Sequence, residues 1–384
     1  MTGSWRLILA LWGAGLGAAM QYAKISVIYD LLGGVYPDGG VALGWLVSVV
    51  GGVGIVLGVI AGLLVARIRY RRALLGALWL GAAVSVGQAL LPPLPAMLAL
   101  RMIEGVSHLA IVVAAPTLIA QIATDQQRGL ALTLWGTFFG VAFAVMAWVG
   151  RPFAIWAGLP ALFALHGAYM AGFALFLSAR LRSLPQEGEA PVLRWRAVLA
   201  SHASIYRSPH IAAPAFGWLF YTFCFVSILT VLPPFLDPSV RTLVMGAMPL
   251  TSIIVSMTLG VVMLRYTSAV NVVVWGFVLS VLCMIWLWIM PAGALACLAL
   301  AGAMGLIQGA SFAAVPQLNS SASTQAQANG AMAQMGNLGN TLGTPVMALA
   351  LAGWGYVSLP LLAGLAFACG LFLHLFLARR RGKM

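Results

Sequence analysis

Charged residues are scarce in this sequence. They make up 7% of its 384 residues, against roughly 25% in an ordinary soluble domain. The four cysteines lie within apolar runs at no metal-ligand spacing, and neither a His-Glu-x-x-His motif nor an aspartate-rich metal motif is present. We therefore predict no metal site, no disulfide framework and no cofactor. The composition argues against a soluble protein and against a metalloenzyme.

Long apolar runs are abundant in this sequence. Hydrophobic residues make up 62% of the chain, and runs of about 20 residues, enough to cross a bilayer, recur from end to end. The sequence therefore predicts an all-α polytopic membrane protein with twelve transmembrane helices in two six-helix bundles. The predicted spans are 5–31, 41–66, 73–91, 96–122, 129–150, 154–179, 210–235, 242–264, 268–290, 292–318, 329–352 and 356–378.

The net charge of +13 is distributed unevenly along the chain. Basic residues cluster between the apolar runs rather than on a basic helix with interleaved aromatics, which argues against nucleic acid as a partner. With the N-terminus inside, all but four of the 20 basic residues fall in cytoplasmic segments; Arg151 and Arg241 lie outside, and Lys24 and Arg101 lie within spans. The positive-inside rule then predicts a bacterial inner-membrane protein with both termini in the cytoplasm.

A polar stretch at 181–209 separates the two sets of spans, so the predicted domains are 1–180 and 210–384. Aromatic and aliphatic residues stand beside arginines in this linker: Trp195, Leu199, Tyr206, Arg194, Arg196 and Arg207. The pattern suits a short helix at the inner membrane surface, or alternatively a plain tether.

The two halves repeat each other at an offset near 200 residues. Ile103–His108 in the fourth span matches Ile307–Phe312 in the tenth, and Pro116 and Pro316 follow them. Residues 129–140 likewise match 329–340. Parallel repeats of this kind predict a solute path between the halves near the membrane midplane, as alternating access requires.

Several partial motifs resemble those of the major facilitator superfamily, and the resemblance covers essentially the whole chain. Residues 62–74 are similar to the family pattern G-x-L-a-D-R-x-G-R-R-x-x-L, with Ala66 and Arg69 in place of the aspartate and the second glycine. Residues 101–105 are similar to the fourth-span pattern R-x-x-Q-G, with Glu104 replacing glutamine. The antiporter pattern G-x-x-x-G-P is half present, because Val141 follows Gly140.

The resemblance implies a secondary transporter and not an enzyme. We expect a monomer that moves a small solute along a path lined by spans one, four, five, seven, ten and eleven. The charge relay that the family's aspartate provides is not carried over to Ala66. Members of one fold carry very different molecules, so the resemblance does not identify the substrate.

Ionisable residues inside the spans are the functional candidates, because a charge near the bilayer centre costs at least about 2.5 kcal/mol. Lys24 and Asp30 lie in the first predicted span, and Arg101, Glu104 and His108 lie on one face of the fourth. Counted at about 1.5 Å per residue, Lys24 and Glu104 are equally deep, whereas Asp30 and Arg101 are both shallow. The depths predict two ion pairs, Lys24 with Glu104 and Asp30 with Arg101.

We expect Arg101, Glu104 and His108 to face the cavity. Lys24 and Asp30 point about 120° apart at roughly 100° per residue, so one of them could face a neighbouring helix instead. Lys24, Arg101 and His108 would bind solute, while Glu104, together with Asp30, would carry the coupling proton. Two alternatives stay open. The ion pairs could only lock helices together, and His108 could be a hydrogen-bonded packing residue.

The second half has no carboxylate, lysine or arginine within its predicted spans. Its candidates for solute binding are neutral: Gln308, which is the repeat partner of Glu104, and Gln334, Asn337 and Thr341, which share a helix face. The alternative is hydrogen bonding between helices. Glycine stripes predict close helix packing; they are Gly54, Gly58 and Gly62, and Gly339 and Gly343.

A proton-coupled transporter, working as a symporter of an anionic or zwitterionic metabolite, is the function that these residues favour. The alternative is an exporter of amphiphilic compounds, with methionine and tryptophan supplying an adaptable apolar wall. A passive channel or scramblase is less favoured. An intramembrane protease is disfavoured, because the Gly105-Val106-Ser107 sequence recurs as Gly309-Ala310-Ser311 in the other half.

Overall fold

The computed structural model describes residues 2–58, 60–183 and 202–382. This part of the chain is built of helices and contains no strand, as expected where backbone groups must be hydrogen-bonded without water. Ten of its stretches are long and apolar enough to cross a membrane, and the last of them, Ser323–Arg381, contains two helices. The 25-residue α1 also has the length to cross a membrane. The prediction of an all-α polytopic fold is confirmed, and these described segments agree with twelve spans.

The first six predicted spans correspond to elements up to Arg180. They are α1 (Thr2–Ser26); η1 (Tyr29–Leu31) and α2 (Leu32–Val35) after it; η2 (Gly40–Ala42), α3 (Leu43–Ser48), η3 (Val49–Gly51), α4 (Gly52–Leu57) and α5 (Ala61–Ile68); α6 (Tyr70–Ala89); α7 (Leu94–Ile122); α8 (Asp125–Gly136), α9 (Phe138–Val145), η4 (Met146–Gly150) and α10 (Arg151–Ala157); and α11 (Leu159–Arg180).

The remaining spans follow the linker. They are α13 (Ala212–Val231), with η6 (Pro233–Phe235) after it; α14 (Pro238–Val255), η7 (Ser256–Gly260) and α15 (Val261–Tyr266); α16 (Ala269–Ile289); α17 (Ala294–Leu318); α18 (Ala322–Trp354), with η8 (Gly355–Val357); and α19 (Ser358–Arg381). A further short turn, η5 (Leu181–Ser183), ends the first set.

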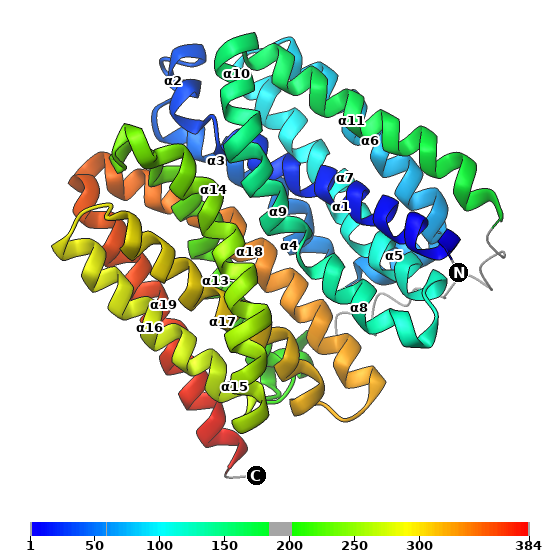
Figure 1. The fold of residues 1–384 in the computed structure, drawn as a ribbon, viewed down its shortest axis with the longest axis vertical. Coiled ribbons are helices and arrows are strands. Elements are labelled where there is room, and N and C mark those ends of the chain that lie inside the picture. Colours follow the sequence, from blue (N-terminus) through cyan, green and yellow to red (C-terminus); the bar gives the residue numbers. More distant parts are fainter. Residues whose placement is uncertain (1, 59, 184–201, 383–384) are drawn as a thin grey trace. The chain divides into compact units, whose positions relative to one another are not determined.

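The chain forms two compact units. We call Met1–Gly39 with Ile60–Leu193 the N-terminal unit, and Gly40–Val59 with Arg194–Met384 the C-terminal unit. In the N-terminal unit α6 lies beside α7 and α11 (Figure 1), and α1 packs against α7, α9 and α11. Helices α7, α9 and α11 thus cover the buried face of α1. The predicted division of the chain at 181–209 stays a prediction.

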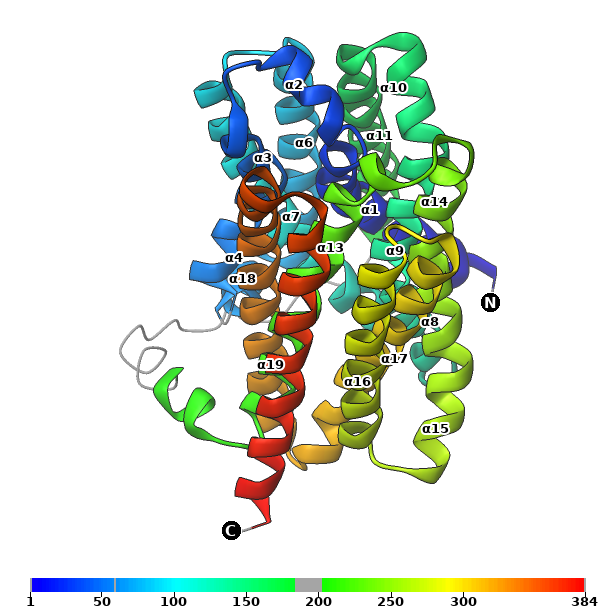
Figure 2. The ribbon, with the colours of Figure 1, turned by 90° about the vertical axis from the view of Figure 1, so that its left-hand side faces the viewer.

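In the C-terminal unit α13 packs against α17, α18 and α19, and α16 packs against α17 and α19 (Figure 2). The second span joins this unit, because α3 and α4 pack against α18. Glycines allow these close approaches. A Cβ at Gly58 would lie 3.0 Å from the Cα of Gln334, and one at Gly343 would overlap the carbonyl of Phe223. The packing predicted for the glycine stripes is present, except that nothing lies within 4 Å of Gly62.

Two helix ends differ from the predicted spans. The first helix ends at Ser26 rather than near residue 31. The fifth span continues through η4 into α10, and the break before the sixth comes at Gly158, whose φ of +89° suits glycine. Pro152 did not mark the break, because proline is well tolerated in the first turn of a helix.

The predicted surface helix of the linker is described only in part. Residues 202–207, which include Tyr206 and Arg207, are helical. Arg194, Trp195, Arg196 and Leu199 lie outside the described residues.

Candidate functional site

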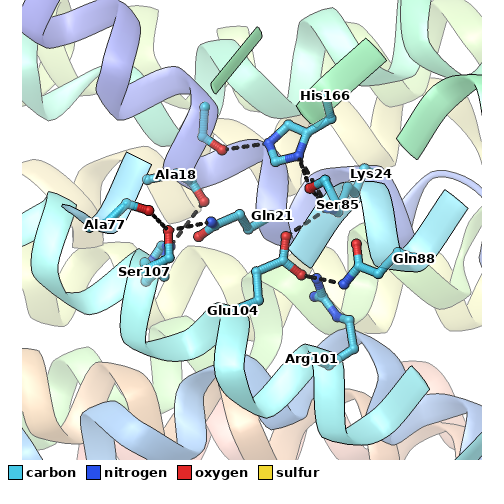
Figure 3. A network of polar contacts seen from close by, with 12 residues as sticks. Ala18, Gln21, Lys24, Ala77, Ser85, Gln88, Arg101, Glu104, Ser107 and His166 are labelled. Atoms are coloured by element: carbon cyan, nitrogen blue, oxygen red, sulfur yellow. Dashed lines mark hydrogen bonds and ion pairs between the residues drawn. The ribbon is translucent and has the colours of Figure 1, made fainter. Parts of the chain in front are cut away.

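A cluster of buried polar side chains lies between α1, α6, α7 and α11 in the N-terminal unit (Figure 3). Its centre is the carboxylate of Glu104. Lys24 Nζ lies 2.6 Å from Oε1, Gln88 Nε2 donates to Oε2 at 2.7 Å, and the Arg101 guanidinium also donates to Oε2. All four side chains are buried, and Lys24, Arg101 and Glu104 are each 0% exposed. One carboxylate thus binds three donors from three helices.

The ammonium of Lys24 is also fully hydrogen-bonded. Besides Glu104, it donates to Ser85 Oγ at 2.9 Å and faces His166 Nδ1 at 3.1 Å, which together match its three N–H groups. The ring of Phe163 lies 5.5 Å from Nζ, close enough for a cation–π contact. Helix α1 is therefore tied through one side chain to α6, α7 and α11.

The charges of this cluster do not balance. Lys24 and Arg101 are cations, and Glu104 is the single carboxylate among the described residues of the cluster. The formal charge is therefore +1 when the histidines are neutral. Buried charges are costly unless they are paired and hydrogen-bonded, so an excess charge here is a feature that packing alone does not require.

One of the two predicted ion pairs is present. Counting depth along the helices correctly matched Lys24 with Glu104, and the pair is fully buried. The predicted pair between Asp30 and Arg101 is wrong. Because α1 ends at Ser26, Asp30 lies beyond the helix, where both its oxygens accept from Arg151 at 2.6 and 2.8 Å.

The shared face of Arg101, Glu104 and His108 points into the N-terminal unit. None of the three faces lipid, because their exposed fractions are 0%, 0% and 7%. His108 Nδ1 lies 2.9 Å from the carbonyl of Ala18, and its ring meets the ring of Tyr22 edge-on. These contacts are those of a packing residue, which is the alternative that the sequence left open. A role for His108 in binding solute stays a prediction.

Three of the four neutral candidates of the C-terminal unit bind protein groups, whereas the buried Thr341 hydroxyl has no hydrogen-bond partner among the described residues. Gln308 Oε1 accepts from Ser252 at 3.3 Å, and Asn337 donates to the carbonyl of Ala333 at 2.8 Å. Gln334 accepts from the hydroxyl of Tyr206 at 2.6 Å and donates to the carbonyl of Ile55 at 2.7 Å. Interhelical bonding is thus observed for Gln308 and Gln334, and binding of solute by these residues stays a prediction.

Four residues of importance were not singled out from the sequence. Ser85, Gln88 and His166 complete the buried cluster, and His374 is a buried histidine in α19 of the C-terminal unit. His166 and His374 carry the signal that marked Lys24, an ionisable residue inside an apolar run. Ser85 carries no such signal, since hydroxyls are common in membrane helices.

The comparisons agree with this architecture. The sequence model of the Major Facilitator Superfamily matches residues 7–241. The human organic anion transporter MFSD10 (TETRAN) has a similar structure, with a TM-score of 0.70 and 17% identity over 97% of this chain and 99% of its own. So does a bacterial homolog of the human lysosomal transporter Spinster, in an inward-facing and unoccupied conformation, with a TM-score of 0.73 and 14% identity over 98% and 95%. No curated protein sequence matches the chain. At these identities the structural likeness shows the fold.

Proposed function

Because the chain belongs to the Major Facilitator Superfamily, and is therefore a transporter rather than an enzyme, we propose that it couples proton movement to the transport of a small organic anion or zwitterion. The observation that carries this proposal is the charge of the buried cluster. It holds two cations and one carboxylate, Glu104, that can take up a proton.

Charge balance links the proton to the solute. Protonation of Glu104 changes the formal charge of the cluster from +1 to +2. In a medium of low dielectric constant the second charge is expensive, and an anionic group nearby offsets it. Proton and anion then favour each other's binding by the same free energy, which is the thermodynamic requirement for symport. The argument rests on this chain's own residues, and not on the substrate of the human transporter.

The first step of the test is to find a ligand of the protein. Purified protein is screened by thermal shift against small carboxylates and amino acids at two pH values, because a ligand stabilises the state that it binds. Uptake of the ligand is then measured in proteoliposomes with and without an inward proton gradient. We expect saturable uptake that the gradient accelerates. Uptake that is neither saturable nor affected by the gradient would indicate a passive channel.

Glu104→Gln mimics the protonated carboxyl group and tests the coupling site. We expect this variant to keep solute binding and exchange between two solute-loaded compartments, and to lose the acceleration by a pH gradient. Asp125→Asn is the matched control, since the Asp125 side chain is 92% exposed and pairs with Arg128 away from the cluster. Full pH-driven accumulation by the Gln variant would show that Glu104 is not the coupling site.

Export of an amphiphilic compound is the second candidate. The 17 methionines and 13 tryptophans of the chain favour it, because they could form an adaptable apolar wall. Methionine adapts its shape to irregular ligands. The cluster's positive charge then predicts stabilisation by lipophilic anions. Stabilisation by lipophilic cations alone would instead indicate an exporter that prefers cationic compounds.

A further inference from the structure

Lys24 has acceptors on three helices besides its own, and only one of them is a charged group. Glu104 comes from α7, whereas Ser85 comes from α6 and His166 from α11 (Figure 3). If Glu104 becomes neutral, the ammonium loses its counter-charge and keeps the two neutral acceptors. The structure therefore contains two neutral partners that already contact the ammonium group and can hold it without Glu104.

The hydrogen bonds define the state of the His166 ring. Its Nε2 lies 2.9 Å from the carbonyl of Gly17, which only accepts, so Nε2 carries a proton. Its Nδ1 lies 2.7 Å from Ser85 Oγ and 3.1 Å from Lys24 Nζ. A proton on Nδ1 would face the ammonium directly, so this nitrogen is an acceptor and the ring is neutral.

We propose that His166 is a positioning residue for coupling: its Nδ1, together with Ser85, retains the Lys24 ammonium when Glu104 takes up a proton. The proton adds to a carboxylate oxygen of Glu104, and Lys24 keeps its three protons. The ammonium then keeps its contacts with α6 and α11 through Ser85 and His166. This inference rests on the proposed function and extends it from the proton site to the side chains that hold the neighbouring cation.

The charges around His166 argue for positioning rather than proton carriage. The ring and its neighbours comprise the cations Lys24 and Arg101 on α1 and α7, the carboxylate Glu104 on α7, and neutral groups of Ser85 and Gln88 on α6. Phe163, on the same helix as His166, adds no charge. Protonation of His166 would add a third cation beside Lys24 and Arg101. Protonation of Glu104 instead neutralises the anion of the cluster.

Two substitutions of His166 test the roles of the two ring nitrogens separately. In His166→Asn the amide oxygen can replace the acceptor Nδ1, and in His166→Gln the amide nitrogen can replace the donor Nε2. We expect His166→Gln to shift the midpoint of pH-activated uptake to more acidic pH, because the protonated state then lacks one of its two neutral acceptors for Lys24. A shift of about one pH unit corresponds to a tenfold weaker proton affinity. His166→Asn should keep the wild-type midpoint, whatever its rate.

Exchange at constant pH and size-exclusion profiles show that each variant is folded and binds solute. If His166→Gln does not fold, Ser85→Ala removes the other neutral acceptor and should shift the midpoint in the same direction. Equal shifts in Asn and Gln variants, or no shift in Gln and Ser85→Ala, would overturn the inference while leaving Glu104 as the coupling site. A wild-type protein whose uptake does not depend on pH would overturn the proposed function and this inference together.

Discussion

Lys24 and Glu104 form one ion pair, but removing one or the other leaves a different charge in the cluster. Removing Lys24 leaves one cation and one carboxylate, Arg101 and Glu104, which still pair. Removing the charge of Glu104 leaves two cations together in a site that is 0% exposed. Loss of one partner from a buried pair typically costs about 3–5 kcal/mol, mainly because the other charge is left uncompensated.

We therefore expect Glu104→Gln to lower the free energy of unfolding by about 3 kcal/mol or more, and Lys24→Met to lower it by clearly less. The double variant should recover part of the loss, because one cation has gone with the carboxylate. Reversible unfolding by denaturing detergent in mixed micelles measures all three. Equal losses in the two single variants would mean that charge balance does not set the stability of this cluster.

The sequence correctly predicted a contact in this cluster where the position of each residue along its own helix was enough to predict it. The depth of Lys24 in α1 and of Glu104 in α7 follows from the rise per residue, and so their pairing could be predicted. The partners Ser85 and His166 depend on which helices surround α1, and spacing along the chain carries no such information. The position of Asp30 was predicted wrongly because the first span was predicted to continue to residue 31, whereas α1 ends at Ser26.

Helix α18 contains glycines in two different settings. A Cβ at Gly343 would overlap the backbone carbonyl of Phe223 in α13, which cannot move as a side chain could. Gly353 lies on the same helix with nothing within 4 Å of its added Cβ. Neither has a positive φ, so the two positions differ in the space around them and not in backbone conformation.

Gly343→Ala should force α13 and α18 apart, and overpacking of this kind costs about 1–3 kcal/mol. Gly353→Ala should be neutral or slightly stabilising, because alanine favours the helix. Thermal unfolding followed by size-exclusion chromatography of both variants gives the comparison. A loss of stability in Gly353→Ala as large as in Gly343→Ala would refute close packing as the reason for the stripe.

The linker helix contacts α18 through the hydrogen bond from Tyr206 to Gln334 at 2.6 Å and through the packing of Ile205 against Ala328, Ala331 and Met332. The side-chain amide of Gln334 in turn donates a hydrogen bond to the carbonyl of Ile55 in α4. Burial raises the pKa of Tyr206 to about 12. Because the folded-state pKa is raised, the bond is fully present below about pH 10 and is lost as the pH rises toward 12.

Tyr206→Phe should lower the free energy of unfolding by about 1 kcal/mol, the usual net value of such a bond. The difference from wild type should be the same between about pH 5 and pH 9, since the hydroxyl keeps its proton throughout that range. Tyr266→Phe, at a residue that is 85% exposed, is the control. A difference that grows or disappears within the range would point to another titrating group at this contact.

The spans themselves were predictable because bilayer thickness sets their length and water cannot satisfy their backbone groups. The repeat was equally visible: α7 begins at Leu94 and α17 at Ala294, each with a proline inside the helix at the same offset. The ends of the spans were less predictable, because Gly158 rather than Arg151-Pro152 ends the fifth. Local backbone conformation, and not polarity, decides such a boundary.

The chain as a whole carries its charge in two places, buried in the N-terminal unit and clustered between the spans. The second distribution predicts orientation, because short loops rich in arginine stay in the cytoplasm. Asp38 and Asp125 lie on opposite sides under this prediction. Both are exposed, and the Asp125 side chain is 92% exposed. Cysteines at these two positions therefore report sidedness with little effect on the fold.

We expect a membrane-impermeant maleimide to label Asp38→Cys in intact cells, and to label Asp125→Cys only after the membrane is permeabilised. The background is a chain whose four cysteines are replaced by serine or alanine, because Cys369 is exposed even though Cys224, Cys283 and Cys297 are buried. The unlabelled background is the control for each condition. Labelling of Asp125→Cys from outside, with protection of Asp38→Cys, would reverse the orientation. The arginines between the spans would then face the outer medium, the positive-inside rule would fail for this chain, and any inward proton gradient in the uptake assay would have to be assigned to the opposite face.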